Sequence, residues 1–345
     1  MRQEKGSKIF NKNELDRAAK LLRQGKLVAF PTETVYGLGA NALDGQAVSS
    51  IFSAKGRPAY NPLIVHIATK DDLEQLIASP LSETAEELIA EFWPGPLTLV
   101  VNKSNQVPEI TTGGLETVAV RMPDHNLAVE LIDLSGVPLA APSANLSGRP
   151  SPTAAEHVIA DLAGEIAGVV DGGRSGIGVE STVLDLSGHN PTLLRPGGVT
   201  YEQLQEVLDV VEIDPAVRAK VNQESQGAIS PGMKYKHYAP DAEVILVEGA
   251  AGDVADKINE LVATEDHVGI MASQEYQASY QQGLVKVMGS RSDLDEIGAN
   301  IFKLLRDFDK LKVEKIFIEG LPETGLGLAI MNRLRKSAGY QIINI

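Results

Sequence analysis

Short apolar segments that recur through the first part of the chain constrain its fold most. The sequences KLVAFPTET, PLIVHIA, PLTLVVN, TVAVRMP, VPLAAPSAN, STVLDLS and TLLRPGG are each bounded by Pro, Gly or Asn. Runs of this length with such boundaries predict β-strands. Helical patterns separate several of them: NELDRAAKLLRQG, with Asn13 as its expected cap and Gly25 as its stop, and SETAEELIAEFW, with Ser82 and Glu83 at its start. The first part of the chain is therefore predicted to be a mixed α/β domain.

A second α/β pattern follows a polar stretch. Apolar periodicity fades between Asp209 and Asp241, in the sequence DPAVRAKVNQESQGAISPGMKYKHYAPD. Beyond it, the strand-like segments AEVILVEG, HVGIMAS, LVKVMGS and KIFIEG alternate with the helical segments DVADKINELVA, IFKLLRDFDKL and GLAIMNRLRKS. Such alternation indicates a parallel sheet. We therefore predict a first domain over residues 1–208, a linker or active-site lid over 209–241, and a small Rossmann-like α/β domain over 242–345.

Composition and charge exclude several classes of protein. The chain has 345 residues, of which 43% are hydrophobic and 22% are charged, as expected for a folded protein of two domains. Its net charge of -15 disfavours general electrostatic binding of nucleic acid, so any anion site must be local. Without cysteine, disulfides, thiol nucleophiles and thiolate metal sites are excluded. The start lacks a signal-peptide core and no run of about 18 apolar residues occurs, so we expect a cytoplasmic location and no membrane partner.

The alternation of side chains along strands predicts a basin. Residues of equal parity project from one face of a strand. The sets of equal parity are Ile64 with His66, Thr117 with Ala119 and Arg121, Leu139 with Ala141 and Ser143, and Val179 with Ser181 and Val183. If these faces meet, hydroxyls, small residues, a histidine and arginines line one basin, beside Lys55, Arg57 and Arg195 at strand or loop ends. Because arginine offers phosphate a fork of donors and lysine a point charge, this basin predicts a phosphate-bearing ligand.

Each feature also has a purely structural explanation. His66 fits a hydrogen-bonded histidine in a sheet, Lys55 with Arg57 fits a solvated loop, and the glycines of DGGRSGIGVES fit turns. The sequence contains no G-x-x-x-x-G-K-[ST] phosphate loop, and GAAGDVADK does not match the dinucleotide-binding G-x-G-x-x-G. Ser143 lacks the G-x-S-x-G setting of an acyl-enzyme. No His, Asp and Glu cluster has metal-ligand spacing, so no protein-only metal site is expected.

A set of motifs in register carries a family resemblance. PTETVYGLGANA, KGRPAYNPLIVHI, FWPGPLTLV, VAVRMPDH, APSANLSGRPSPT, DGGRSGIGVESTVLD and LLRPGG run in order from Pro31 to Gly198. Together they closely resemble the YrdC-type L-threonylcarbamoyladenylate synthases. SPGMKYKHYAP and GLGLAIMNRLRKSA are similar to the long, two-domain form, so the resemblance covers nearly the whole chain. It implies that residues 1–208 form a YrdC-like catalytic domain, a twisted mixed sheet with a concave basin.

The resemblance implies a nucleotidyltransferase that uses L-threonine, bicarbonate and ATP, with Mg²⁺ on the phosphates. The products are L-threonylcarbamoyl-AMP, pyrophosphate and water, and a downstream threonylcarbamoyl transferase complex then forms N6-threonylcarbamoyladenosine in tRNA. The implied threonine contacts are Thr34, His66, Arg121, Ala141 and Ser181. The implied ATP contacts are Arg57, Asn61, Thr117, Ser143, Ser151, Arg195 and Tyr235. Lys55 and Arg57 are the implied catalytic pair, and Lys234 or Lys236 are alternatives to Tyr235.

The residues leave two other functions open. A concave cationic basin also fits a double-stranded RNA-binding module without catalysis, although the overall acidity and the small hydroxyl-lined strands favour a compact ligand. The carbamoylating protein of hydrogenase maturation carries a YrdC-like domain too, but it adds cysteine-rich zinc modules, and this chain has no cysteine. The oligomeric state, weak RNA binding and the general base, for which Glu33 and His66 are candidates, are not determined by the sequence.

Overall fold

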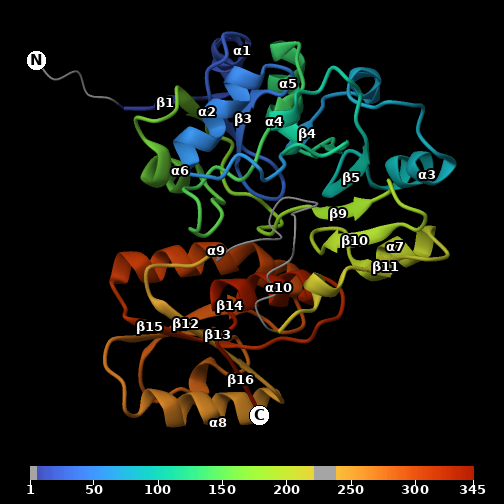
Figure 1. Ribbon diagram of the computed structural model, residues 1–345. Coiled ribbons are helices and arrows are strands. Elements are labelled where there is room, and N and C mark those ends of the chain that lie inside the picture. Colours follow the sequence, from blue (N-terminus) through green and yellow to red (C-terminus); the bar gives the residue numbers. More distant parts are fainter. Residues whose placement is uncertain (1–5, 221–237) are drawn as a thin grey trace, which may run out of the picture.

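The computed structural model describes residues 6–220 and 238–345, which form one large and one small sheet (Figure 1). The large sheet has eleven strands and the small one has five. We call residues 6–220 the large-sheet unit and residues 238–345 the small-sheet unit. The predicted fold class, a mixed α/β sheet followed by a smaller parallel α/β sheet, is confirmed.

The large sheet mixes parallel and antiparallel pairs in the order β1-β8-β2-β3-β7-β4-β6-β5-β9-β10-β11. Its strands are β1 (Lys8–Phe10), β2 (Val28–Phe30), β3 (Gly37–Asn41), β4 (Ile64–His66), β5 (Leu97–Asn102), β6 (Thr117–Arg121), β7 (Leu139–Ala140), β8 (Gly168–Val170), β9 (Thr182–Asp185), β10 (Thr192–Arg195) and β11 (Glu212–Ile213). Its helices are α1 (Leu15–Arg23), α2 (Gly45–Lys55), α3 (Glu83–Phe92), α4 (Glu109–Thr112), α5 (Asn126–Ser135), α6 (Ala155–Leu162) and α7 (Tyr201–Val207). Every apolar segment predicted to be a strand in this unit contains one.

The small sheet is parallel throughout, in the order β14-β13-β15-β12-β16. Its elements are β12 (Glu243–Glu248), α8 (Ala251–Val262), β13 (Val268–Ser273), β14 (Leu284–Gly289), α9 (Leu294–Leu311), β15 (Lys315–Glu319), α10 (Gly327–Ser337) and β16 (Ile342–Asn344). Helices α9 and α10 lie between this sheet and the large-sheet unit, and α8 covers the opposite face (Figure 1). The strand order differs from that of dinucleotide-binding domains, in which the first strand lies beside the second.

Hydrogen bonds at the first turns explain where two predicted helices begin. Ser82 caps α3 as predicted, and its hydroxyl oxygen accepts a hydrogen bond from the Ala85 amide at 3.2 Å. The prediction of Asn13 as the first cap is wrong. Asn11 is the cap, and it starts a single 3-10 turn before α1, because the Glu14 side chain reaches back to it and completes a capping box.

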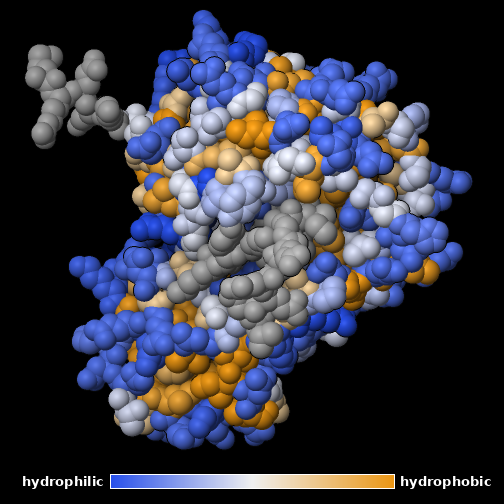
Figure 2. Space-filling model, in the orientation of Figure 1, coloured by the Kyte–Doolittle hydropathy of each residue, from blue (hydrophilic) through white to orange (hydrophobic). Residues whose placement is uncertain are grey.

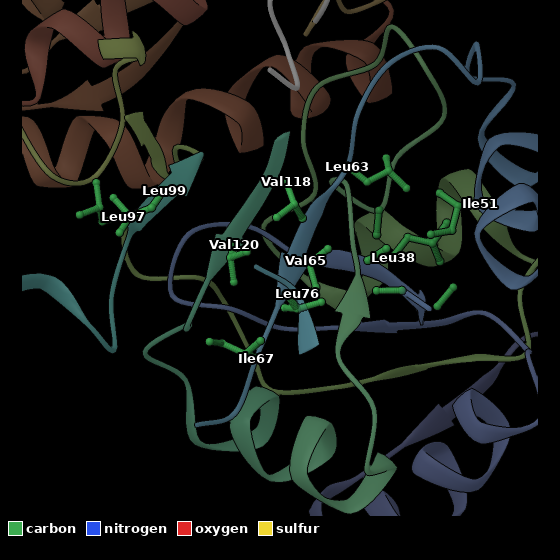
Figure 3. Close-up of a cluster of buried hydrophobic side chains, with 14 of the residues drawn as sticks. Leu38, Ile51, Leu63, Val65, Ile67, Leu76, Leu97, Leu99, Val118 and Val120 are labelled. Carbon is green, nitrogen blue, oxygen red and sulfur yellow. The ribbon is translucent and has the colours of Figure 1, made fainter. Parts of the chain in front are cut away.

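Alternation along the central strands separates the main core from a concave face. Val65 of β4 and Val118 of β6 belong to the main core together with Ile51 of α2 (Figure 3). Ile64 and Ala119 belong to a separate apolar cluster on the other face of the same strands. The predicted parity is therefore confirmed for these two strands, and the second face is free to carry a site.

Helix α10 joins the interiors of the two units. All its residues, Gly327–Ser337, are buried. Leu328 belongs to the main core of the large-sheet unit, whereas Ile330 and Leu334 belong to the core between the small sheet and its helices. Val179 of the large-sheet unit belongs to that second core as well. The two units therefore share a continuous apolar interior.

The polar stretch predicted to be a linker begins with one more strand. Glu212–Ile213 pairs with β10 in parallel, and two residues are too few to show an apolar alternation. Residues 221–237 lie outside the described part of the chain, and so does Tyr235. Described residues resume at Tyr238, three residues before the predicted end of the linker at Asp241. The domain boundaries at 208 and 241 stay predictions.

The surface is mainly hydrophilic in the orientation of Figure 2, and apolar residues gather on the small-sheet unit. Exposed large apolar residues of that unit are Leu284, Val287, Leu311 and Ile345. Within residues 6–220 and 238–345, the helices are too short or too polar to cross a membrane.

We predict that Gly178→Ala weakens the contact between the units. Gly178 has a φ of +75°, and a Cβ there would overlap the backbone of Gly298 and Ala299 in α9. The matched control is Gly173→Ala, at a φ of +79° with no atom within 4 Å of the added Cβ. Both variants bear the left-handed backbone strain of roughly 1–2 kcal/mol. Gly178→Ala should therefore have a lower urea unfolding midpoint than Gly173→Ala. Equal midpoints of the two variants would contradict this interface.

Candidate active site

A pocket lies on the concave face of the large sheet, beside the small-sheet unit. The space between its lining atoms is about 740 Å³, including the part that is open to solvent. The predicted site residues that line it are Thr34, Lys55, Arg57, His66, Arg121, Ala141, Ser143, Ser181 and Arg195. Residues from strands and loops far apart in the sequence therefore converge on one basin, as the parity pattern predicted.

Three predicted residues are not among those that line the pocket. Asn61 is buried, and its side-chain oxygen has no hydrogen-bond partner among the described residues. Thr117 is half-buried at the start of β6. Ser151 is fully buried and donates a hydrogen bond to Glu180 Oε1 at 2.5 Å, so its hydroxyl acts on the pocket through Glu180. The positions of Tyr235, Lys234 and Lys236 lie outside the described residues.

Strands β4 and β6 place a histidine and an arginine side by side. His66 and Arg121 are register partners at the ends of these parallel strands. The Arg121 guanidinium donates from Nη1 to Thr34 Oγ1 at 3.0 Å and from Nε to the Gly95 carbonyl at 3.2 Å. Its Nη2 forms an ion pair with Glu33 Oε1 at 2.5 Å. These contacts fix the plane of the guanidinium, which is the geometry that a bidentate carboxylate contact needs.

Burial keeps His66 neutral. Burial, and then the positive charge of Arg121, lowers the pKa of His66 to about 3. Its Nδ1 lies 3.3 Å from the Ile64 carbonyl, and its ring meets the Phe30 ring edge-on at a centroid distance of 5.9 Å. At neutral pH the imidazole is therefore a hydrogen-bonding group and not a cation.

Lysine and arginine side chains supply the opposite wall. The Lys55 ammonium donates to the carbonyls of Ser143, at 2.5 Å, and of Asn145. Burial, and then the charge of Arg57, lowers the pKa of Lys55 well below its usual range. Burial also lowers the pKa of Arg57 and that of Arg195 to about 10, so both remain charged at neutral pH.

Arg195 connects this wall to the serine before β9. It donates from Nε to the Ser181 carbonyl at 3.0 Å and from Nη2 to Ser181 Oγ at 3.1 Å. Ser181 Oγ also lies 2.8 Å from Thr98 Oγ1. The pocket of this acidic chain thus has a local excess of cations, as expected for an anionic ligand.

Comparison with known proteins identifies the family. A family model for Sua5, YciO and YrdC, described as "Telomere recombination", matches residues 20–197, and one described as "Threonylcarbamoyl-AMP synthase, C-terminal domain" matches residues 199–339. The threonylcarbamoyl-AMP synthase of Pyrococcus abyssi is 54% identical over 328 residues, which cover 95% of each chain. The chain belongs to the threonylcarbamoyl-AMP synthase family. The family predicted from the sequence motifs is confirmed.

Further relatives agree with membership of the threonylcarbamoyl-AMP synthases. The Bacillus subtilis enzyme of that name is 50% identical over 334 residues, which cover 96% of this chain and 95% of that one. The crystal structure of Pyrococcus abyssi Sua5 complexed with L-threonine superposes with a TM-score of 0.93 at 52% identity, covering 98% of this chain and all of the other. The pocket described above therefore belongs to a threonylcarbamoyl-AMP synthase fold.

Several lining residues of this threonylcarbamoyl-AMP synthase pocket were not predicted, among them Glu180 and Tyr238. Glu180 precedes Ser181, and strict alternation would place it on the opposite face, but β9 begins only at Thr182, so alternation does not apply there. Tyr238 lies three positions after the predicted Tyr235, in the same KYKHYAP motif, at a φ of +66°. The motif was the sequence signal for a tyrosine at the pocket. Among the described residues, its second tyrosine, Tyr238, lines the pocket.

We predict that His66 makes the protein less stable in acid. Its pKa is about 3 when folded and about 6.5 when unfolded, so the unfolded chain takes up the proton first and stability falls below pH 6.5. Between pH 7 and pH 5, this residue alone should cost wild type about 2 kcal/mol of unfolding free energy. His66→Gln should lose that much less than wild type in urea unfolding at the two pH values. His189→Gln, at an exposed position, is the control, and it should follow wild type.

Proposed function

We propose that the pocket binds L-threonine beside ATP and forms L-threonylcarbamoyl-AMP, pyrophosphate and water from these substrates and bicarbonate. Family membership supports the reaction. The observation that carries the proposal is the presence of two chemically different groups of residues in one pocket. One group surrounds a single fixed arginine, Arg121, and the other combines Lys55, Arg57 and Arg195.

The Arg121 group forms the threonine subsite in this proposal. The guanidinium, held by Thr34 and Gly95, binds the substrate carboxylate. His66 and Ser181 offer neutral hydrogen-bonding groups for the amino, carbamate and hydroxyl groups. Ala141 leaves room for the side chain of threonine because it carries only a methyl group.

The cationic wall forms the ATP subsite. Arg57 and Arg195 face the triphosphate, and Ser143, whose carbonyl accepts from Lys55, lines the same pocket. Each charged hydrogen bond to phosphate contributes about 1.5–3 kcal/mol. Lys55 stabilises the turn at Ser143 and Asn145 and, with Arg57, faces the charge that develops on pyrophosphate. The buried Asn61 oxygen and Thr117 complete the nucleotide contacts in this assignment.

The reaction needs a neutral amine and good positioning. The threonine amine attacks the carbon of bicarbonate and water leaves, which gives the carbamate. A carbamate oxygen then attacks the α-phosphorus, and the bond to pyrophosphate breaks. Glu33, whose carboxylate pairs with Arg121, is the better candidate for a general base, because the lowered pKa of His66 makes its imidazole a weak base.

Mg²⁺ enters the proposal with the nucleotide. Mg²⁺ prefers phosphate oxygens and water, and bound there it neutralises charge on the phosphates. Among residues 6–220 and 238–345, there is no group of three His, Asp or Glu side chains that could hold a metal ion. The pocket residues fit a metal that ATP itself brings, with the arginines of the wall sharing the phosphate charge.

The remaining expectations extend this proposal. Residues 1–208 would form the catalytic domain, 209–241 the linker or lid, and 242–345 the small domain. A cytoplasmic location follows from the proposed use of ATP and of a product destined for tRNA. The product would pass to a threonylcarbamoyl transferase complex, and weak RNA binding would accompany that transfer.

We predict that the purified protein forms a carbamoyl-adenylate with threonine and not with other amino acids. The assay incubates the chain with ATP, Mg²⁺, bicarbonate and one amino acid at a time, and follows pyrophosphate and the adenylate by mass spectrometry. Serine, which lacks one methyl group, is the matched control for the Ala141 side of the pocket. Salt-dependent binding of double-stranded RNA without pyrophosphate release would reverse the assignment.

We predict that two arginine substitutions affect the KM values of different substrates. Arg57→Ala should raise the KM for ATP, and Arg121→Ala should raise the KM for threonine, each by at least about tenfold, the equivalent of one charged hydrogen bond. Each variant is the control for the other, because both remove a buried guanidinium from the same pocket. If both KM values rise equally in both variants, the two subsites are not separate.

A further inference from the structure

A residue of the small-sheet unit reaches the wall of the pocket. Arg333 of α10 is only 1% exposed. Its Nε donates to Glu180 Oε2 at 2.7 Å, and its Nη2 donates to the Pro196 carbonyl at 3.0 Å. Glu180 lines the pocket, and Pro196 directly follows Arg195, which lines it as well. One guanidinium from α10 therefore connects two wall segments of the other unit.

Glu180 in turn organises its neighbours. It accepts hydrogen bonds from Ser151 Oγ, at 2.5 Å, and from the Tyr238 hydroxyl. Burial raises the pKa of Glu180, but the charges of Arg333 and Arg195 and its hydrogen bonds outweigh burial and bring that pKa to about 2. The carboxylate is thus ionised, and a buried ionised carboxylate needs its cationic partner.

Tyr238 packs against the same helices. Its ring stacks on Phe302 of α9 at a centroid distance of 5.1 Å, and the Arg333 guanidinium lies 5.6 Å from the ring centroid. Helix α9 also holds the loop before Ser151, because Arg306 donates to the Pro150 carbonyl and pairs with Asp161 at 2.8 Å. The small-sheet unit therefore contacts the residue before Ser151 and the residue after Arg195, which are two proposed ATP residues.

We propose that Arg333 is a positioning residue for the ATP side of the pocket. It holds the Glu180 carboxylate, and Glu180 accepts hydrogen bonds from the buried Ser151 and from Tyr238, which lines the pocket. This inference rests on the proposed function and assigns the small-sheet unit a part in ATP affinity. The guanidinium of the threonine subsite is held separately, since Arg121 contacts Thr34, Gly95 and Glu33, all in the large-sheet unit.

The test compares Arg333→Lys with Arg335→Lys. Arg335 lies two positions after Arg333 on α10, is also 1% exposed, and donates from Nε to a carboxylate, Glu248 Oε1, at the same 2.7 Å. Glu248, however, belongs to β12 and does not line the pocket. Lysine keeps the charge in both variants but cannot form the fork of two hydrogen bonds.

We expect Arg333→Lys to raise the KM for ATP by about tenfold, the factor that one charged hydrogen bond corresponds to. The KM for threonine should change by less than about twofold. Arg335→Lys should leave both KM values at wild-type level, even if both variants lower the unfolding midpoint. If Arg333 had a purely structural role, Arg333→Lys would lower the amount of active enzyme, and hence the apparent kcat. It would not raise the KM for ATP while Arg335→Lys leaves that KM unchanged.

A double-mutant cycle with Glu180→Gln tests whether Arg333 acts through Glu180. The double variant should have a KM for ATP no higher than the larger of the two single variants, because both changes interrupt one chain of contacts. If Arg333→Lys does not fold, Ser151→Ala removes only the far end of that chain and should raise the KM for ATP in the same direction. Circular dichroism reports folding for each variant.

The outcomes separate this inference from the proposed function. If wild type forms no threonylcarbamoyl-AMP, the proposed function fails. If wild type is active but Arg333→Lys has the KM values of wild type, or shares a raised KM for ATP with Arg335→Lys, the positioning role is overturned. Additive effects of Arg333→Lys and Glu180→Gln would also overturn it.

Discussion

Buried charge is the constraint on which this structure depends. Guanidinium and carboxylate groups lose hydration when they are buried, so each must find a partner of opposite charge or a set of hydrogen bonds. Here Arg121 pairs with Glu33, and Glu180 pairs with Arg333. Two further arginines of the pocket donate to uncharged groups: Arg57 to the Pro62 carbonyl, and Arg195 to the carbonyl and hydroxyl of Ser181. The arginines gathered in this pocket are the feature on which the proposed ATP subsite rests.

Strand alternation accounts for the part of the site that the sequence predicts well. Ile64 with His66 and Ala119 with Arg121 lie on β4 and β6, whose faces are defined by their alternate burial in the main core. The apolar pattern is strong there because one face must be buried. The fold class and the strands of both sheets follow from the same signal, since it is local and repeats along the chain.

The sequence predicts less where the chain leaves regular strands. Strand β7 ends at Ala140, and the pocket is lined by Pro142 as well as by Ala141 and Ser143, so alternation does not hold there. Glu180 precedes β9 and turns into the pocket for the same reason. The pairing of Glu180 with Arg333 joins residues 153 positions apart, and no periodicity in a single sequence indicates such a contact. The family motifs predicted several site residues that periodicity does not indicate. In the KYKHYAP motif they predicted Tyr235, which lies outside the described residues, and did not predict Tyr238.

Because the two units share an interior around α10, the two sheets of this chain are not packed as two separate domains. Two sheets suggest two independent folding units, yet Leu328 belongs to the core of one sheet while its neighbours on the same helix belong to the core of the other. A fragment that stops after the large sheet would expose the apolar slot that Leu328 fills and would leave Glu180 as an anion without its guanidinium. Sheet membership therefore marks where strands pair, whereas cooperative unfolding is expected to include both sheets and the helix between them.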